Sequence, residues 1–150
     1  MMGVAGSKDV GAFIKSVLGL APVRVTAGGG ADNVDQNGPA IDREGYLSCE
    51  FSLVAQGVLA TLETAAVDAR IQDSADGSTG WNNYGDPAPT LNLADGVNNE
   101  RGMTNGKLNL DGAKRFIRLV GKANPSAGST DTVDIAGVVT LGGPNELPAT

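Results

Sequence analysis

The chain has 150 residues, a net charge of -6 at pH 7, a pI near 4.5, no histidine and a single cysteine. This length predicts one domain with a substantial hydrophobic core. The acidic balance argues against a nucleic-acid partner, because phosphate binding needs clustered Lys and Arg. The absence of histidine excludes Ser-His-Asp and Cys-His catalysis and His-ligated metals. The chain has no long apolar run, so we expect no membrane partner.

The first predicted element is an α-helix from Ser7 to Leu18. Its apolar residues fall at helical spacing; they are Val10, Phe13, Ile14, Val17 and Leu18. A helix this short is marginal alone, so its apolar stripe needs a surface to pack on, either its own domain or a neighbouring subunit. Residues 1–20 form the predicted N-terminal arm. Within it, Val10, Phe13, Ile14 and Val17 are candidate contacts with another subunit.

Short strands separated by turns dominate the rest of the chain. The predicted strands cover residues 23–26, 46–54, 90–93, 116–123 and 132–141, with a further strand from about residue 59 or 62 to 72. In the strand Tyr46 to Val54, Leu47, Cys49, Phe51 and Leu53 share one face. In the last strand, Val133, Ile135, Gly137, Val139 and Leu141 point inward. This pattern predicts an all-β fold over residues 21–144, an antiparallel β-sandwich of jelly-roll type, followed by a tail at residues 145–150.

A hairpin in the middle of the chain connects two of these strands. Its turn, Asp73 to Gly80, contains Asp-Gly and several side chains that bond their own backbone. A calcium loop would need oxygen ligands where Ala75 and Gly77 stand, so we expect no metal. Trp81 and Tyr84 follow the turn, beside two asparagines. They are candidate glycan contacts, although aromatic residues on strands more often pack against the hairpin itself.

Long polar loops and the C-terminal tail are the remaining candidates for contacts with other molecules. The loop from Ala94 to Asn105 contains Asn98, Asn99, Glu100 and Arg101, and the tail contains Asn145 and Leu147. Carboxylate pairs such as Asp42 with Glu44 carry no recognisable catalytic environment, and a small sandwich offers little concave volume. We therefore expect no enzyme activity, no catalytic residue and no cofactor.

Four stretches, in this order, resemble a family of small head proteins of tailed bacteriophages. They are AIDREGY at residues 40–46, RIQDSADGST at 70–79, KRFIRLV at 114–120 and LGGP at 141–144. The resemblance is to capsid decoration, or cement, proteins with a jelly-roll-like fold, and it covers Ala40 to Pro144. The N-terminal segment is not part of the pattern.

The resemblance implies a virion structural protein on the outer capsid surface, assembled in the host cytoplasm. Its partners would be the major capsid protein, whose subunits it bridges, and further copies of itself in a homodimer or homotrimer. The family offers no catalytic residues. Two alternatives remain open at this point: a carbohydrate-binding module for host adhesion, and a head-completion or tail-tube protein.

Overall fold

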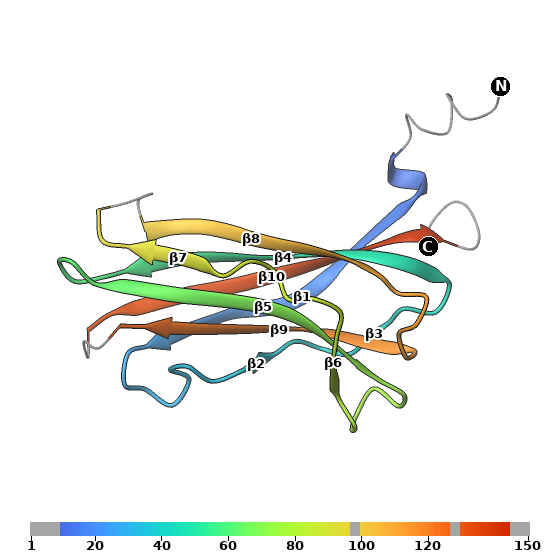
Figure 1. Ribbon diagram of the computed structural model, residues 1–150, viewed down its shortest axis with the longest axis horizontal. Helices are drawn as coiled ribbons and strands as arrows, with labels where there is room; N and C mark the ends of the chain where they lie inside the picture. Colours follow the sequence, from blue (N-terminus) through green and yellow to red (C-terminus); the bar gives the residue numbers. More distant parts are fainter. Residues whose placement is uncertain (1–9, 97–99, 127–129, 145–150) are drawn as a thin grey trace.

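The computed structural model describes residues 10–96, 100–126 and 130–144 as a two-layered antiparallel β-sandwich (Figure 1). One sheet has four strands in the order β1-β10-β4-β8, and the other has six, with β2-β9-β5-β6 in line, β3 beside β9 and β7 beside β5. The strand bounds are β1 Ile14–Thr26, β2 Gln36–Asn37, β3 Ile41–Asp42, β4 Tyr46–Val58, β5 Thr64–Ser74, β6 Asn82–Tyr84, β7 Leu91–Ala94, β8 Arg101–Asn109, β9 Phe116–Pro125 and β10 Thr132–Pro144.

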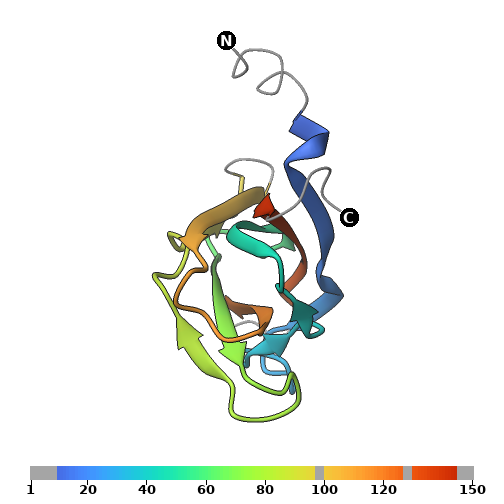
Figure 2. The ribbon, with the colours of Figure 1, turned by 90° about the vertical axis from the view of Figure 1, so that its right-hand side faces the viewer.

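The pairing order makes this fold a jelly roll. The chain folds back on itself as one long hairpin, in which β1 pairs with β10, β2 and β3 with β9, β4 with β8, and β5 with β6 and β7. Rolling this hairpin up adds the β10–β4 and β5–β9 ladders. Figure 2, seen along the strands, shows the two sheets rolled around a common interior, and buried apolar side chains fill it. The predicted all-β jelly-roll class is therefore confirmed.

The predicted N-terminal α-helix is wrong. The described part of this segment has only one 3₁₀ turn, η1 at Val10–Ala12, after which β1 begins at Ile14. The chain is extended here because β1 pairs with β10 along its whole length, from Ile14 opposite Gly142 to Thr26 opposite Thr132. A short isolated helix has no comparable source of stability. The boundary between residues 20 and 21 consequently falls inside a strand.

The predicted long loop at residues 94–105 is partly a strand, because β8 begins at Arg101. Its inward positions include glycines, since bulky neighbours occupy the space. A Cβ on Gly106 would lie 2.4 Å from Cζ of Phe51, and one on Gly102 would lie 2.7 Å from Cδ1 of Leu91. The neighbouring side chains therefore supply the apolar contacts that the sequence of β8 lacks.

The core has the alternation that the sequence predicts for its longest strands. Cys49, Phe51 and Leu53 of β4 are buried. The inward positions of β10 are buried as well; they are Val133, Ile135, Gly137, Val139 and Leu141. Leu47 is an exception, since 47% of it is exposed at the start of β4. Burial raises the pKa of the Cys49 thiol to about 11, as expected of an apolar rather than a reactive cysteine.

Candidate functional site

The sandwich has two ends with different chemistry, separated by the length of the strands. The 13-residue strand β10 runs from one end to the other, a distance of about 40 Å at ~3.3 Å per residue. At one end lie the β3–β4, β5–β6 and β8–β9 connections, which we call the motif end. At the other lie the β1–β2, β4–β5, β7–β8 and β9–β10 connections, which we call the acidic end (left in Figure 1).

The stretches that carry the family resemblance meet at the motif end, where they hold the connections together. Arg115 forms ion pairs with Asp42 at 2.9 Å and Glu44 at 3.0 Å, and its hydrogen bonds hold the pKa of Asp42 below its usual range. The Arg43 guanidinium donates to the Lys114 carbonyl at 3.0 Å. These motifs therefore hold the connections of the motif end together.

The hairpin turn at this end is organised by Asp76. One of its carboxylate oxygens accepts the backbone N–H groups of Ser78 and Thr79, each at 2.8 Å. These bonds lower the pKa of Asp76 well below its usual range, with the bond from Thr79 the largest cause. Gly77 has a φ of +74°, and a Cβ there would lie 3.0 Å from the Phe116 ring. Among the residues that the structure describes, no three His, Cys, Asp or Glu side chains gather as a metal site.

The two aromatic residues after the turn use their polar atoms within the protein. The Trp81 ring lies 4.4 Å from the guanidinium of Arg118, and its indole N–H donates to the Ser78 carbonyl at 3.2 Å. The Tyr84 hydroxyl donates to the Asn109 carbonyl at 2.7 Å. These contacts fasten the hairpin to the sandwich. A glycan contact at Trp81 and Tyr84 stays a prediction from the sequence.

At the acidic end, carboxylates from other connections hold the β4–β5 turn in place. The backbone N–H of Leu59 donates to Glu100 at 3.1 Å, that of Ala60 to Asp131 at 2.8 Å, and that of Leu62 to Asp95 at 3.2 Å. A charged acceptor makes each of these bonds stronger than a neutral one. The turn is therefore rigid, although it lies at the surface.

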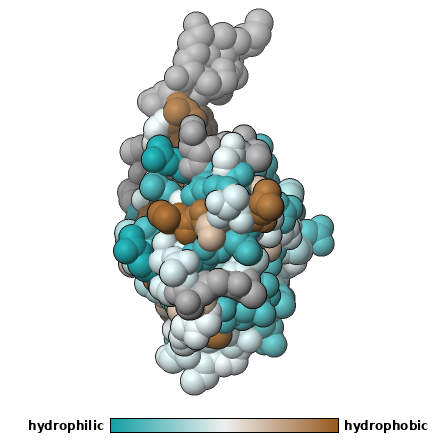
Figure 3. All heavy atoms as spheres, turned by 90° about the vertical axis from the view of Figure 1, so that its left-hand side faces the viewer, coloured by the Kyte–Doolittle hydropathy of each residue, from teal (hydrophilic) through white to brown (hydrophobic). Residues whose placement is uncertain are grey.

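The tip of this turn presents Leu62 to solvent in a strained conformation. Leu62 is 91% exposed and has a φ of +69°. The left-handed region costs a side chain with a Cβ about 1–2 kcal/mol, and strain of this kind is concentrated at functional sites. Figure 3, which views this end directly, shows hydrophobic side chains as separate spots on a mostly hydrophilic surface. Leu62 is thus an exposed apolar side chain on a turn that carboxylates hold in place.

Charge is distributed unevenly between the two ends. The four connections at the acidic end contain no Lys or Arg in the sequence, and their acidic residues are Asp32, Asp35, Glu63, Asp95, Glu100 and Asp131. Asp35 forms an ion pair with Arg70. The connections at the motif end contain both signs, including Arg43, Lys114 and Arg115. A potential of this kind favours approach of a basic partner to the acidic end.

The predicted contact residues that the structure describes lie at both ends of the sandwich. Val10 is 64% and Ile14 36% exposed, near the motif end. Phe13 is half-buried and Val17 packs against the core. Glu100 and Arg101 lie at the acidic end, where Glu100 holds the turn described above. Asn98, Asn99, Asn145 and Leu147 lie outside the described residues. Leu62 is not among the predicted contact residues, because the sequence pattern assigns it to a strand, whereas β5 begins only at Thr64.

The outer face of the four-stranded sheet carries a second surface feature. Apolar side chains cross all four strands on this solvent-facing side; they are Leu18, Pro22, Val54, Met103, Ala136 and Val138, and we call this set the apolar band. Register places Leu18 opposite Val138, and Val54 opposite both Ala136 and Met103. A solvated antiparallel face is usually polar, so this band is unusual.

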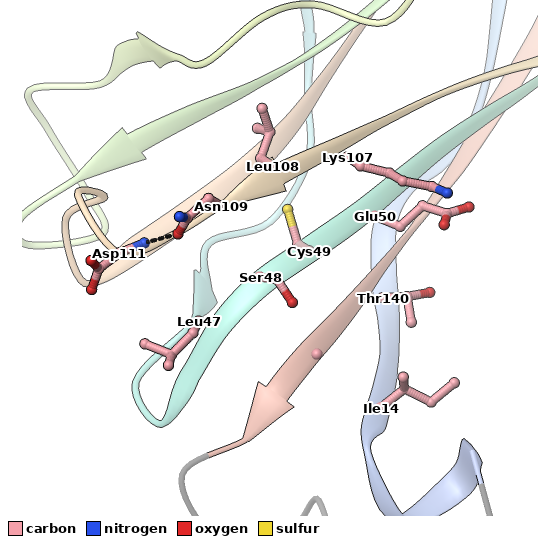
Figure 4. Close-up of a pocket in the computed structure, with 11 residues that line it drawn as sticks. Ile14, Leu47, Ser48, Cys49, Glu50, Lys107, Leu108, Asn109, Asp111 and Thr140 are labelled. Carbon is pink, nitrogen blue, oxygen red and sulfur yellow. Dashed lines mark hydrogen bonds between the residues drawn. The ribbon is translucent and has the colours of Figure 1, made fainter. Parts of the chain in front are cut away.

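The same face has two hollows, one toward the motif end and one within the band. One of about 770 Å³ lies toward the motif end, with Ile14, Ser48, Glu50, Lys107 and Thr140 in its lining. Figure 4 shows Glu50 and Lys107, from neighbouring strands, reaching toward one another. The other, of about 370 Å³, is lined by residues that include Pro22, Val54, Arg101 and Ala136. The outer face therefore combines exposed apolar side chains with two depressions.

No protein-family model and no curated protein matches this sequence. Solved structures do share its fold. A chain from T=1 particles derived from infectious bursal virus has a TM-score of 0.53 and 12% identity, with 88% of this chain and 31% of that chain covered. This chain thus spans about a third of that viral protein. At such identity the likeness shows the jelly-roll fold alone.

Two further structures have lower scores. A chain from the acidic stable capsid of Helicobacter pylori bacteriophage KHP30 has a TM-score of 0.42, 13% identity and coverage of 89% of this chain and 95% of that one. A family 4 carbohydrate-binding module, CBM4, has a TM-score of 0.47, 16% identity and coverage of 89% and 83%. Both TM-scores are below 0.5, so neither structure assigns this chain to the capsid proteins or to the carbohydrate-binding modules. In the described part of the chain, no helix is long and apolar enough to cross a membrane.

Proposed function

We propose that this protein is a bacteriophage virion structural protein that decorates the capsid and bridges major capsid protein subunits. The observation that carries the proposal is Leu62, 91% exposed and in the left-handed region on a turn held by three carboxylates. An apolar side chain in that position gains free energy only when another molecule covers it. Burying a leucine contributes about 1.5–3 kcal/mol.

The partner that fits the acidic end is a protein surface with an apolar socket and basic residues around it. Opposite charge on the two surfaces speeds association and fixes the orientation of docking. Contacts at both ends, about 40 Å apart along the strands, would let one copy reach two neighbouring capsid subunits. Many such contacts over a shell would add up to high avidity, although each is weak. We place the protein on the outer surface of the head.

The test is binding to phage heads from which this protein is absent. Labelled protein is titrated against such heads and against free major capsid protein, at low and high salt. We expect saturable binding to the heads only, weakened by salt because the acidic end contributes to it. Absence of saturable binding to heads would refute the decoration function.

Stoichiometry in purified virions separates this proposal from its rivals. Quantitative mass spectrometry against the major capsid protein is expected to give a simple shell-wide ratio. An amount equal to one ring per particle would instead indicate a head-completion or tail-tube protein. If the protein is absent from virions, the structural role is rejected, and a glycan array becomes the test of the carbohydrate-binding alternative at Trp81.

A further inference from the structure

We infer that the outer face of the β1-β10-β4-β8 sheet is the face through which two copies of this protein form a dimer. This inference builds on the proposed function, in which the protein acts as an oligomer, and assigns a surface and a stoichiometry to that state. It concerns a different surface from the acidic end. Its tests need no capsid.

The apolar band provides the driving force. Leu18 and Met103 are each 56% exposed, Val54 48% and Val138 46%. They come from all four strands of the sheet. Leu18 pairs with Val138 and Val54 with Met103, and Ala136, two residues from Val138 on β10, pairs with Val54 and joins the two pairs. Covering apolar surface stabilises association by roughly 25 cal/mol for each Å² removed from water. A contiguous set of this kind is typical of an interface and differs from the single exposed apolar residues common on monomers.

The charges on this face favour a second copy over the basic partner suggested for the acidic end. Next to the band, Arg24 forms a two-bond ion pair with Asp134 at 2.8 and 2.9 Å. On its other side Glu50 lies opposite Lys107 across the ladder. The face therefore carries both signs, whereas the chain as a whole has a net charge of -6. Two copies of an acidic protein approach each other with least repulsion through such a face.

The size and relief of the face fit an isologous dimer, in which each copy contributes the same surface. Four strands about 4.8 Å apart and up to about 40 Å long give a face of about 750 Å². A stable interface buries about 800 Å² on each partner. The hollow of about 370 Å³ lies within the apolar band, among Pro22, Val54 and Ala136, and the hollow of about 770 Å³ lies toward the motif end. The same face therefore carries exposed side chains and depressions that can receive them. A dimer would also present two acidic ends to a shell.

The experiment measures the mass of the full-length protein in solution by sedimentation equilibrium over a range of concentrations. The chain has a mass of 15.1 kDa, and we expect twice this value. The variants Val54→Lys and Met103→Lys are expected to sediment as monomers with unchanged far-UV circular dichroism, because both side chains are already about half exposed. Val34→Lys is the matched control: Val34 is also 48% exposed but lies in the β1–β2 connection. This variant is expected to remain a dimer.

A monomeric wild-type protein, a trimer, or dimers that survive both band substitutions would overturn the inference. Loss of the dimer in the Val34→Lys control would also overturn it, because the effect would then not be specific to the band. The two proposals fail separately. A monomer that binds heads would overturn only the dimer, and a dimer that does not bind heads would overturn only the decoration function.

Discussion

Replacing Leu62 by glycine is expected to make the protein more stable and its capsid binding weaker. Glycine removes the cost of about 1–2 kcal/mol that a Cβ incurs at the observed φ of +69°. The greater conformational freedom of glycine in the unfolded chain offsets about 0.5–1 kcal/mol of this gain. Loss of the side chain itself costs little folding free energy, because 91% of Leu62 is exposed. The net gain should be about 0.5–1 kcal/mol.

Urea denaturation measures the first effect. With a slope of about 2 kcal/mol per M, the midpoint for Leu62→Gly should rise by roughly 0.3–0.5 M. Binding to heads should fall about 10- to 100-fold, which corresponds to the ~1.5–3 kcal/mol of one buried leucine. Thr61→Gly, one position earlier in the same exposed turn, is the control and should lower the midpoint. A lower midpoint for Leu62→Gly would refute the strain argument, and unchanged binding would show that Leu62 is not an anchor.

Three further expectations concern the fold. Gly38→Ala should destabilise the protein by about 3 kcal/mol or more, because the new Cβ would lie 1.7 Å from the Gly19 carbonyl oxygen. Gly30→Ala is the control, since the space around its Cβ is open. Urea denaturation measures the stability of both variants. The free energy of unfolding should stay level from about pH 8 to 5.5, since the chain has no histidine, and should fall below about pH 4. The reason is that the pKa of Asp76 is lowered in the folded state, so its contribution to stability is present above the ordinary carboxyl pKa and is lost as the pH falls through the folded value. Asp76→Asn should make the loss of stability with falling pH less steep. An unchanged slope of stability against pH would contradict the assignment. Arg118→Met should shift the emission of Trp81, the only tryptophan, to longer wavelength and cost about 1 kcal/mol; an unchanged spectrum would show that the stacking does not persist in solution.

The fold class and the inward faces of the long strands could be predicted from the amino-acid sequence alone. In β10, every second residue from Val133 to Leu141 is either apolar or glycine, and all of them are buried. This alternation is a local property, because successive side chains of a strand point to opposite faces whatever the strand pairs with. The Asp76-Gly77 turn could be predicted for the same reason, because its hydrogen bonds join residues close in sequence.

The conformations of the N-terminal segment, β8 and the acidic end depend on long-range contacts that the sequence pattern does not reveal. The apolar spacing of Val10, Ile14 and Val17 fits a helix, but pairing with β10, more than a hundred residues away, makes the segment extended from Ile14. Gly102 lies in the stretch predicted as a loop, but it is part of β8, where Leu91 fills the space that a side chain would need. The exposed conformation of Leu62 could not be predicted, because carboxylates from connections distant in sequence hold its turn. Long-range pairing supplies free energy that no local pattern contains, and it outweighs local preference wherever the two disagree.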